Sequence, residues 1–255
     1  MLTRYDAEIA LLKADLAYTR KQRDVAQHDL KVFKHNRVRE DEARVSHEKE
    51  RLAHLNRFFT HPSRSRLAPF FPNAKEVTES YGAFHAVNTH LPHLDRGDAG
   101  VVVVVVGDGH SPRTGALFAM SSAWRVYSVD PVIRFKHNGA VERLVVLPLK
   151  VEDAAGYLPE SKKVLIVAVH SHARLRDAVR AVGPCERLDV VSIPCCVPQL
   201  IPYVDEDGAD TLVKIDPDVV YEDQSILSPE RTVLIWKDVY KRREDQGLKE
   251  LTREP

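Results

Sequence analysis

The chain has 255 residues, and its 37 basic and 37 acidic side chains give a formal net charge of zero. This balance excludes a strongly basic or acidic protein and supplies no overall argument for binding to nucleic acid or to a membrane. A hydrophobic content of 44% is enough to bury one full core, so we expect one globular domain with an appendage.

The sequence also bears on the compartment of the protein. No apolar run approaches the roughly 18 to 20 residues that a membrane-spanning helix needs. Asp6 and Glu8 lie where a signal peptide requires an apolar segment and where a transit peptide avoids acids. The 3 cysteines make a poor disulfide framework. We therefore expect an intracellular protein, cytoplasmic or nuclear, with no membrane partner.

The first 60 residues have the pattern of a long helix. Apolar or tolerated side chains recur at alternating steps of three and four from Leu2 to Phe33, and seven-residue steps continue from Val38 to Phe59. A second copy, another protein or the chain itself must cover such a seam. Two interpretations of residues 1–60 stay open: a helical, coiled-coil-like arm for dimerisation or docking, and a helical hairpin packed on its own domain.

Residues 61–98 are expected to form a linker and a helix. Three prolines between residues 60 and 73 indicate the linker. Residues 74–91 follow, and their apolar positions have helical spacing.

From residue 99 to residue 255 strand patterns alternate with helix patterns. Val101–Val106 predicts a strand that is apolar on both faces, as at the centre of a parallel sheet. The further strand candidates are residues 124–130, 141–149, 162–170, 187–194, 210–221 and 231–240. The predicted fold class is α/β: a Rossmann-like, doubly wound, mostly parallel seven-stranded sheet with an antiparallel terminal hairpin, preceded by the long N-terminal helical arm.

The turn after the first strand is where sheets of this type usually contact a cofactor. The nicotinamide fingerprint G-x-G-x-x-G fits this turn badly, because Pro112 stands where the third glycine belongs, and Arg113 adds further bulk. A nucleotide-dependent oxidoreductase therefore has only the general α/β pattern in its favour.

Residues 100–240 resemble the class I S-adenosylmethionine-dependent methyltransferases, whose sheet has five parallel units and then a terminal hairpin. The resemblance implies S-adenosylmethionine as cofactor. It implies that Asp130, at the end of the second strand, binds the ribose hydroxyls, and that Asp153 or Glu152, just past the third strand, meets the adenine amino group. The turn that lies under the cofactor's methionine part consists of Gly107, Asp108, Gly109, His110 and Ser111.

Several of these residues also have an interpretation that involves no ligand. Gly107 and Gly109 suit a tight strand-to-helix turn, because glycine adopts conformations that other residues avoid. Asp108 suits a cap of the following helix. Asp130 suits a turn of its own. The case for a site therefore rests on the joint placement of these residues at one edge of the sheet.

The acceptor side of the expected site lacks both standard motifs of the family after the fourth strand. His170 and His172 stand there instead, and residues 194–199, which contain two adjacent cysteines, follow the fifth strand. These features are similar to a less common group, which includes a tRNA ribose methyltransferase and has a histidine after strand four and Pro-Cys-Cys after strand five. His170 is the candidate catalytic base, and a hydrogen-bonded structural histidine is the alternative.

The cysteines are expected to pack as small apolar residues rather than to act as nucleophiles. A zinc site formed by Cys185, Cys195, Cys196 and a histidine lacks the C-x-x-C or H-x-x-x-H spacing of such sites. The sequence therefore predicts no metal.

Two functions follow from these patterns. The first is an active S-adenosylmethionine-dependent methyltransferase with RNA as the candidate acceptor. The second is a catalytically inactive, methyltransferase-like subunit that acts as a structural or docking component through its N-terminal helix. The partners expected are RNA, contacted by basic residues such as Arg64–Arg66 and Lys241–Arg243, and a second copy or another protein, bound by residues 1–60.

Overall fold

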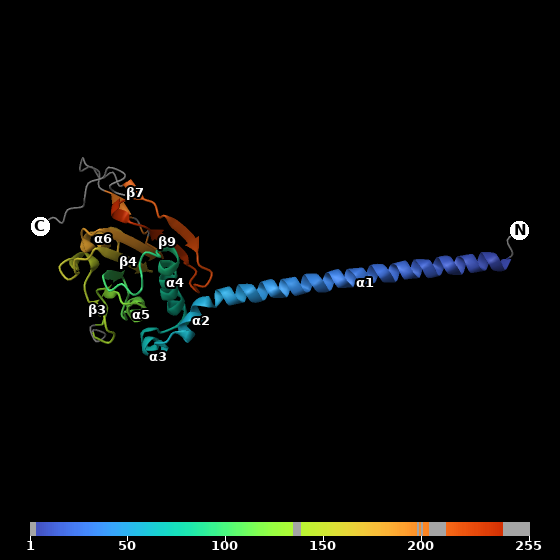
Figure 1. Cartoon of the computed structure of the whole chain (residues 1–255), viewed down its shortest axis with the longest axis horizontal. Helices are drawn as coiled ribbons and strands as arrows, with labels where there is room; N and C mark the ends of the chain where they lie inside the picture. The colour runs from blue at the N-terminus through green and yellow to red at the C-terminus, as the bar shows by residue number, and fades with distance from the viewer. Residues whose placement is uncertain (1–3, 135–138, 198, 200, 204–212, 242–255) are drawn as a thin grey trace. The chain divides into compact units, whose positions relative to one another are not determined.

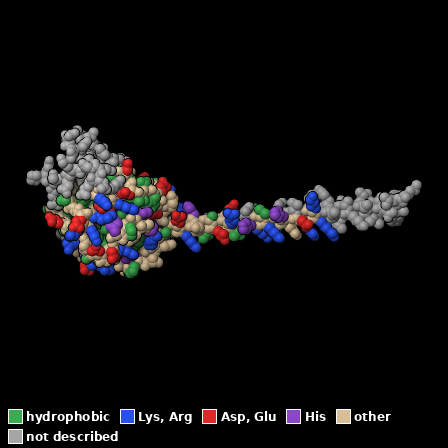
Figure 2. All heavy atoms as spheres, turned by 45° about the horizontal axis from the view of Figure 1, so that its top comes forward, with side chains coloured by type: hydrophobic (Ala, Val, Ile, Leu, Met, Phe, Trp, Pro, Cys, Tyr) green, Lys and Arg blue, Asp and Glu red, His purple; other side chains and the backbone are tan. Residues whose placement is uncertain are grey.

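The computed structural model describes residues 4–134, 139–197, 199, 201–203 and 213–241 (Figure 1). The chain divides into two units that meet between Glu50 and Arg51. The first unit is a single helix, α1 (Arg4–Arg51). Figure 2 shows charged side chains of both signs, with hydrophobic ones among them, along the described part of α1. Coiled-coil pairing of this helix stays a prediction.

The second unit begins earlier than the sequence suggested. Residues that we assigned to the arm form a separate helix, α2 (Ala53–Thr60), which packs on α4 (Ala74–His90). Phe58 of α2 lies in the hydrophobic core, and the side chain of His54 is fully buried. These buried side chains explain why α2 belongs to the compact unit.

The expected linker also contributes to the core. It contains two short helices, α3 (Arg64–Leu67) and η1 (Ala68–Phe70), whose residues Leu67 and Phe70 are buried. Helix α4 then begins at a typical cap, because the side chain of Asn73 accepts a hydrogen bond from the amide of Glu76 at 3.0 Å.

The central sheet confirms the α/β part of the predicted fold class, a mostly parallel seven-stranded sheet. Its seven strands have the order β3-β2-β1-β4-β5-β9-β8, in which β1 to β5 are parallel, β9 is antiparallel to β5, and β8 and β9 form the terminal hairpin. The strands of this sheet are β1 (Val101–Val106), β2 (Arg125–Val129), β3 (Leu144–Leu147), β4 (Lys163–Val169), β5 (Arg187–Ile193), β8 (Val219–Glu222) and β9 (Thr232–Trp236).

Helices cover both faces of the sheet, which explains the unbroken valine run. Val101, Val103 and Val105 pack in one core cluster with α4 and α5 (Arg113–Ser121). The alternate valines of β1 pack in a second cluster with α6 (Leu175–Val182) and the short helix η3 (Val151–Asp153). Because successive side chains of a strand point to opposite faces, a central strand between two cores must be apolar throughout.

Two details of the chain differ from the predictions. The candidate strand at residues 210–221 is divided in its described part, residues 213–221: β7 (Val213–Ile215) pairs with β6 (Ile201–Tyr203) in a separate two-stranded sheet, and β8 begins after Pro217. Proline lacks an amide donor, so it is disfavoured inside a long strand and is confined mainly to edges and ends. Among the described residues, η3 is the one helix between the end of β2 and the start of β4, so the strand and helix alternation is less regular than expected.

None of the described helices combines the length and the apolar character that crossing a bilayer requires. The parallel strands β1, β2, β4 and β5 end at one edge of the sheet, which we call the carboxyl edge. Their first residues lie at the opposite edge, the amino edge.

Candidate functional site

The turn after β1 lies at the carboxyl edge and depends on its glycines. Gly107 and Gly109 have φ angles of 74° and 71°, in the left-handed region that favours glycine. The amide of Gly107 donates to the carbonyl oxygen of Val129 at 2.9 Å, which ties the turn to the end of β2. A Cβ atom on Gly107 would lie 2.8 Å from the Cβ of Ser171, so no larger residue fits here.

Asp108 lies between these glycines and caps α5. Its carboxylate accepts hydrogen bonds from the amides of Thr114 and Gly115 at 3.0 and 2.9 Å and from the hydroxyl of Ser128 at 2.6 Å. The residue is buried, and this burial raises the pKa of its carboxyl group against the opposing effect of these hydrogen bonds. Asp108 therefore has the capping role that was the alternative to cofactor contact.

Asp130 connects the end of β2 to the turn after β1. Its Oδ2 atom accepts a hydrogen bond from the amide of Gly109 at 2.9 Å, and its Oδ1 atom accepts one from the amide of Val132 at 2.9 Å. A carboxylate oxygen can accept two hydrogen bonds, so each oxygen retains one acceptor position. Asp130 can therefore hold the turn and still accept hydrogen bonds from two neighbouring hydroxyls.

The other residues predicted for the cofactor have mixed surroundings. The hydroxyl of Ser111 donates a hydrogen bond to the carbonyl oxygen of Phe70 at 3.1 Å, and this bond anchors the turn to η1. His110 is exposed, as are Asp153 and Glu152 at the end of η3. The structure thus brings Gly107, Gly109 and Asp130 together by hydrogen bonds, and places Asp153 beyond β3 with its side chain open to solvent.

Arg113 is a charged residue of this edge whose role the sequence did not reveal. Its guanidinium lies 3.6 Å from the position of a Cβ atom on Gly109, and it forms an ion pair with Glu76 of α4 at 2.7 Å. The sequence suggested only that Arg113 adds bulk. The structure shows that it presents a positive charge against the glycine turn.

His170 lies at the end of β4 with a φ angle of 49°. Its Nε2 atom is 3.1 Å from the carbonyl oxygen of Glu230, and its Nδ1 atom is 3.7 Å from Oε1 of Glu79. Because a carbonyl oxygen only accepts, Nε2 carries a proton, and Nδ1 is the one ring atom that could take up another. The geometry gives His170 the hydrogen-bonded arrangement of the structural alternative, and its role as a base stays a prediction.

Glu79 is the second charged residue that sequence reasoning missed. It lies on the buried side of α4, and its Oε1 atom is 3.2 Å from Nζ of Lys75. Nothing in the helical pattern distinguishes Glu79 from a solvent-facing acid, because only the packing of α4 at the edge of the sheet buries it.

The cysteines divide between the two edges of the sheet. Cys185 precedes β5, and burial raises the pKa of its thiol to about 12. Cys195 and Cys196 follow β5, and Cys196 is exposed rather than packed. The hydrogen bond that Cys196 shares with Cys195 raises the pKa of the Cys196 thiol. A metal site that combines Cys185 with the other two is excluded, because they lie at opposite ends of one strand.

These surroundings suit S-adenosylmethionine. The half-exposed glycine turn allows close approach of an amino-acid part, and the guanidinium of Arg113 complements a carboxylate. Asp130 retains acceptor positions for a vicinal diol. The strand order and the antiparallel β9 agree with the sheet plan expected from the sequence, five parallel strands followed by a terminal hairpin.

Comparisons with known proteins return only distant structural similarities. No protein-family model matches the sequence, and no curated protein matches it. Among solved structures, MtNAS in complex with S-adenosylmethionine has a TM-score of 0.38 and 17% identity, covering 74% of this chain and 72% of that chain. A protein from Corynebacterium glutamicum has a TM-score of 0.38 and 14% identity, covering 73% of this chain and 96% of that chain. The fold assignment rests on the strand order of this chain, because these scores are too low to support it.

Proposed function

We propose that this protein is an S-adenosylmethionine-dependent methyltransferase whose cofactor binds at the carboxyl edge. The observation that carries the proposal is the 2.9 Å hydrogen bond between the amide of Gly109 and Oδ2 of Asp130. This bond joins the turn that would contact the amino-acid part of the cofactor to the carboxylate that would contact its ribose.

Each residue has a definite task in this proposal. The backbone of Gly107 and Gly109 leaves room for the methionine part, and Arg113 pairs with its carboxylate. Asp130 accepts hydrogen bonds from the ribose hydroxyls, and Asp153 accepts one from the adenine amino group. When bound, the cofactor supplies a methyl group on a sulfonium. The protein's contribution to the transfer is then mainly the alignment of the acceptor with that methyl group.

His170 is the proposed residue on the acceptor side. Its Nδ1 atom, held 3.7 Å from the buried carboxylate of Glu79, can take a proton from an acceptor hydroxyl, and the carboxylate then stabilises the imidazolium. The contact of Nε2 with the carbonyl oxygen of Glu230 fixes the ring for this role.

RNA is the proposed acceptor class. Phe59 is an exposed aromatic residue, and the guanidinium of Arg64 lies over its ring, 6.0 Å from the ring centroid. Arg66, two residues after Arg64, is also exposed. Exposed aromatic and arginine planes stack on unpaired bases, and arginine contacts phosphates. Replacement of Phe59 by alanine is expected to weaken binding of a single-stranded RNA about tenfold, whereas Tyr157→Ala, at another exposed aromatic residue, is expected to leave it unchanged.

Calorimetric titration of the full chain with S-adenosylmethionine and with S-adenosylhomocysteine tests the cofactor proposal. We expect micromolar binding and a loss of about tenfold or more in Asp130→Asn, because charge-assisted hydrogen bonds to the ribose disappear. Asp98→Asn, at the amino edge, is the matched control and is expected to bind normally. Absence of heat with the unaltered protein at millimolar ligand would contradict the proposal.

A second candidate function, structural assembly through α1, has an observation of its own. Val38, Val45 and Leu52 follow one another at seven-residue steps and are 55%, 49% and 42% exposed, and Leu30 and Phe33 are exposed as well. A second copy of the chain could cover this seam in a coiled coil. A stable dimer without binding of S-adenosylmethionine would favour this function over the first.

A further inference from the structure

Three potential metal ligands meet at the carboxyl edge beyond the ends of β4 and β5. His172 follows β4, whereas Cys195 and Cys196 follow β5. The two strands are parallel neighbours, and Val169 is paired with Ile193 at their ends. The chain segments that leave the two strands therefore start side by side, and the three ligand atoms lie within 4.8 Å of one another.

Two of the three distances between these atoms have the values of a tetrahedral metal centre, and the third is within 4.8 Å. The Sγ atoms of Cys195 and Cys196 are 3.7 Å apart, and Sγ of Cys196 is 3.4 Å from Nε2 of His172. With Zn–S bonds of about 2.3 Å and Zn–N bonds of about 2.0–2.1 Å, tetrahedral angles place two sulfur ligands about 3.8 Å apart, and sulfur and nitrogen about 3.5 Å apart. One ion could therefore bind all three atoms with little rearrangement.

Neither a disulfide nor apolar packing accounts for the cluster. The sulfur atoms are too far apart for a disulfide, whose S–S bond is about 2.0 Å. Apolar packing does not explain why Cys196 and His172 are exposed to solvent while their polar atoms point toward each other. Thiolate and imidazole together are a ligand set that suits zinc rather than magnesium or calcium.

We propose that His172, Cys195 and Cys196 bind one Zn²⁺ ion, with the fourth position open to solvent. Three protein ligands and one open position are the arrangement of catalytic rather than structural zinc sites. Sγ of Cys195 also lies 3.7 Å from the carbonyl oxygen of His170. A bound ion would thus stand beside the acceptor side of the edge. Its use to polarise an acceptor rests on the proposed function, whereas the binding of the ion does not.

Cobalt is the probe that tests this site. The full chain, stripped of metal and kept reduced, is titrated with Co²⁺. Tetrahedral thiolate coordination gives a charge-transfer band in the near ultraviolet and intense bands in the visible spectrum. We expect one Co²⁺ per chain, displaced by one Zn²⁺. Absence of these bands at saturating Co²⁺ would overturn the proposal.

The third cysteine provides a matched control. Cys195→Ser, Cys196→Ser and His172→Gln are each expected to weaken Co²⁺ binding by about tenfold or more, because each removes one ligand. Cys185→Ser removes a free thiol at the other end of β5 and is expected to leave the titration unchanged. Equal losses in Cys185→Ser and Cys195→Ser would indicate unspecific thiol binding and overturn the proposal.

One further measurement and one condition of the titration keep the result unambiguous. Thermal unfolding of each variant identifies any loss that comes from misfolding, and His172→Gln, on an exposed residue, is the variant expected to keep its melting temperature. The titration contains no S-adenosylmethionine, so a failure of the cofactor proposal and a failure of the metal proposal give separate results.

Discussion

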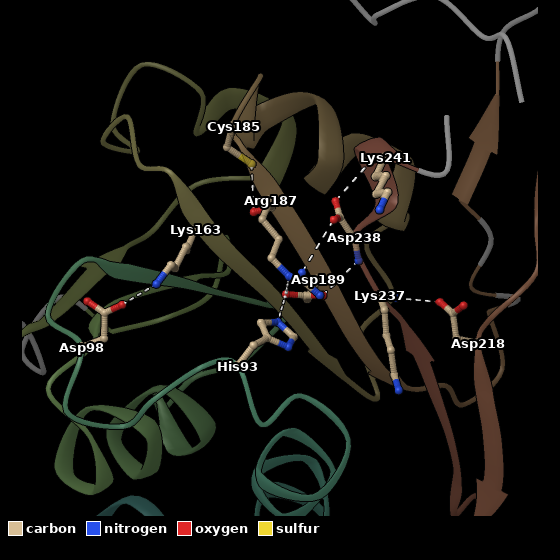
Figure 3. A network of polar contacts seen from close by, with 10 residues as sticks. All are labelled: His93, Asp98, Lys163, Cys185, Arg187, Asp189, Asp218, Lys237, Asp238 and Lys241. Carbon is tan, nitrogen blue, oxygen red and sulfur yellow. Dashed lines mark hydrogen bonds and ion pairs between the residues drawn. The ribbon is translucent and has the colours of Figure 1, made fainter. Parts of the chain in front are cut away.

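The charged groups at the two edges of the sheet differ in how they are paired. At the amino edge, charges pair with one another: Asp189 is fully buried and accepts hydrogen bonds from His93, Arg187 and the amide of Asp238 (Figure 3). At the carboxyl edge, Asp130 retains acceptor positions and two thiols face a histidine. The carboxyl edge also has ion pairs, Arg113 with Glu76 and His54 with Asp223, but in addition it has groups that could bind a ligand.

A hollow at the amino edge supports this distinction. It has a volume of about 690 Å³, and its lining includes Asp98, Lys162, Lys163 and Glu186. These residues form two ion pairs, Lys163 with Asp98 at 2.8 Å and Lys162 with Glu186 at 2.6 Å. Because four of its five charged side chains pair with one another, the hollow offers a ligand less than its size suggests.

The largest effect is expected at the buried carboxylate of the amino edge. Asp189→Ala leaves His93 without its carboxylate and leaves Arg187 with the longer ion pair to Asp238 at 3.7 Å, so we expect the free energy of unfolding to fall by about 4 kcal/mol. Urea unfolding measures the loss. Binding of S-adenosylmethionine, measured at a temperature where the variant stays folded, is expected to be unchanged. A weakened affinity would mean that the two edges do not have separate roles.

The turn of the carboxyl edge provides the next largest effect. Gly107→Ala combines an unfavourable backbone conformation with overlap on Ser171, and is expected to cost about 3 kcal/mol together with a loss of cofactor binding. Gly139→Ala has the same backbone conformation in open space and is expected to cost about 1 kcal/mol. Gly156→Ala, with neither feature, is expected to change stability by less than about 0.5 kcal/mol. Equal losses in the three variants would show that neither the backbone conformation nor the overlap determines the cost.

A buried pair at the carboxyl edge sharpens the comparison through pH. Asp223 follows β8 and lies 2.7 Å from Nε2 of His54. Burial acts to raise the pKa of Asp223, but the hydrogen bond and charge of His54, together with the amide of Ser225 and the charge of His85, outweigh it, so the pKa lies below its ordinary value. Because the pKa of Asp223 is lower in the folded state than in the unfolded state, its ionised carboxylate stabilises the folded protein. This stabilisation is complete above the unfolded-state pKa of about 3.9 and is lost as the pH falls through the folded-state pKa.

Chemical unfolding between pH 7 and pH 2 measures this contribution. Asp223→Asn is expected to be less stable than the unaltered protein at pH 7, and the difference is expected to shrink as the solution becomes acidic. A difference that does not depend on pH would show that Asp223 contributes by packing alone.

A change outside both edges is expected to have the smallest effect on the compact unit. Val38→Glu and Val45→Glu together place charges on the apolar seam of α1, so a dimer is expected to become a monomer in light scattering with no change in melting temperature. Ser46→Glu is the control, since it adds a charge to the same helix beside the seam. Dissociation in the control as well would show that charge, rather than the seam, controls assembly.

The sequence predicted the sheet well, and it placed the glycine turn and Asp130 at one end of the sheet, whereas their role as a cofactor site stays a prediction. Unbroken valines in β1 and the glycines after it give local signals that survive in the structure, and the capping role of Asp108 was one of two stated alternatives. Glu79 and Arg113 were missed because only tertiary packing brings α4 against the edge. The sequence analysis set aside a cysteine and histidine site on spacing, because the residues of the cluster follow two different strands and have no fixed spacing along the chain.

The uniform valine strand has a consequence for how the sheet is aligned during folding. If β1 shifted its pairing register along the neighbouring strands, one valine would take the place of another. The side chains within β1 therefore do not determine its register. The register is instead determined by the flanking bonds, from the amide of Gly107 to Val129 at one end and from the hydroxyl of Ser161 to the carbonyl oxygen of Gly100 at the other. The strand at the centre of the sheet is thus positioned by its ends.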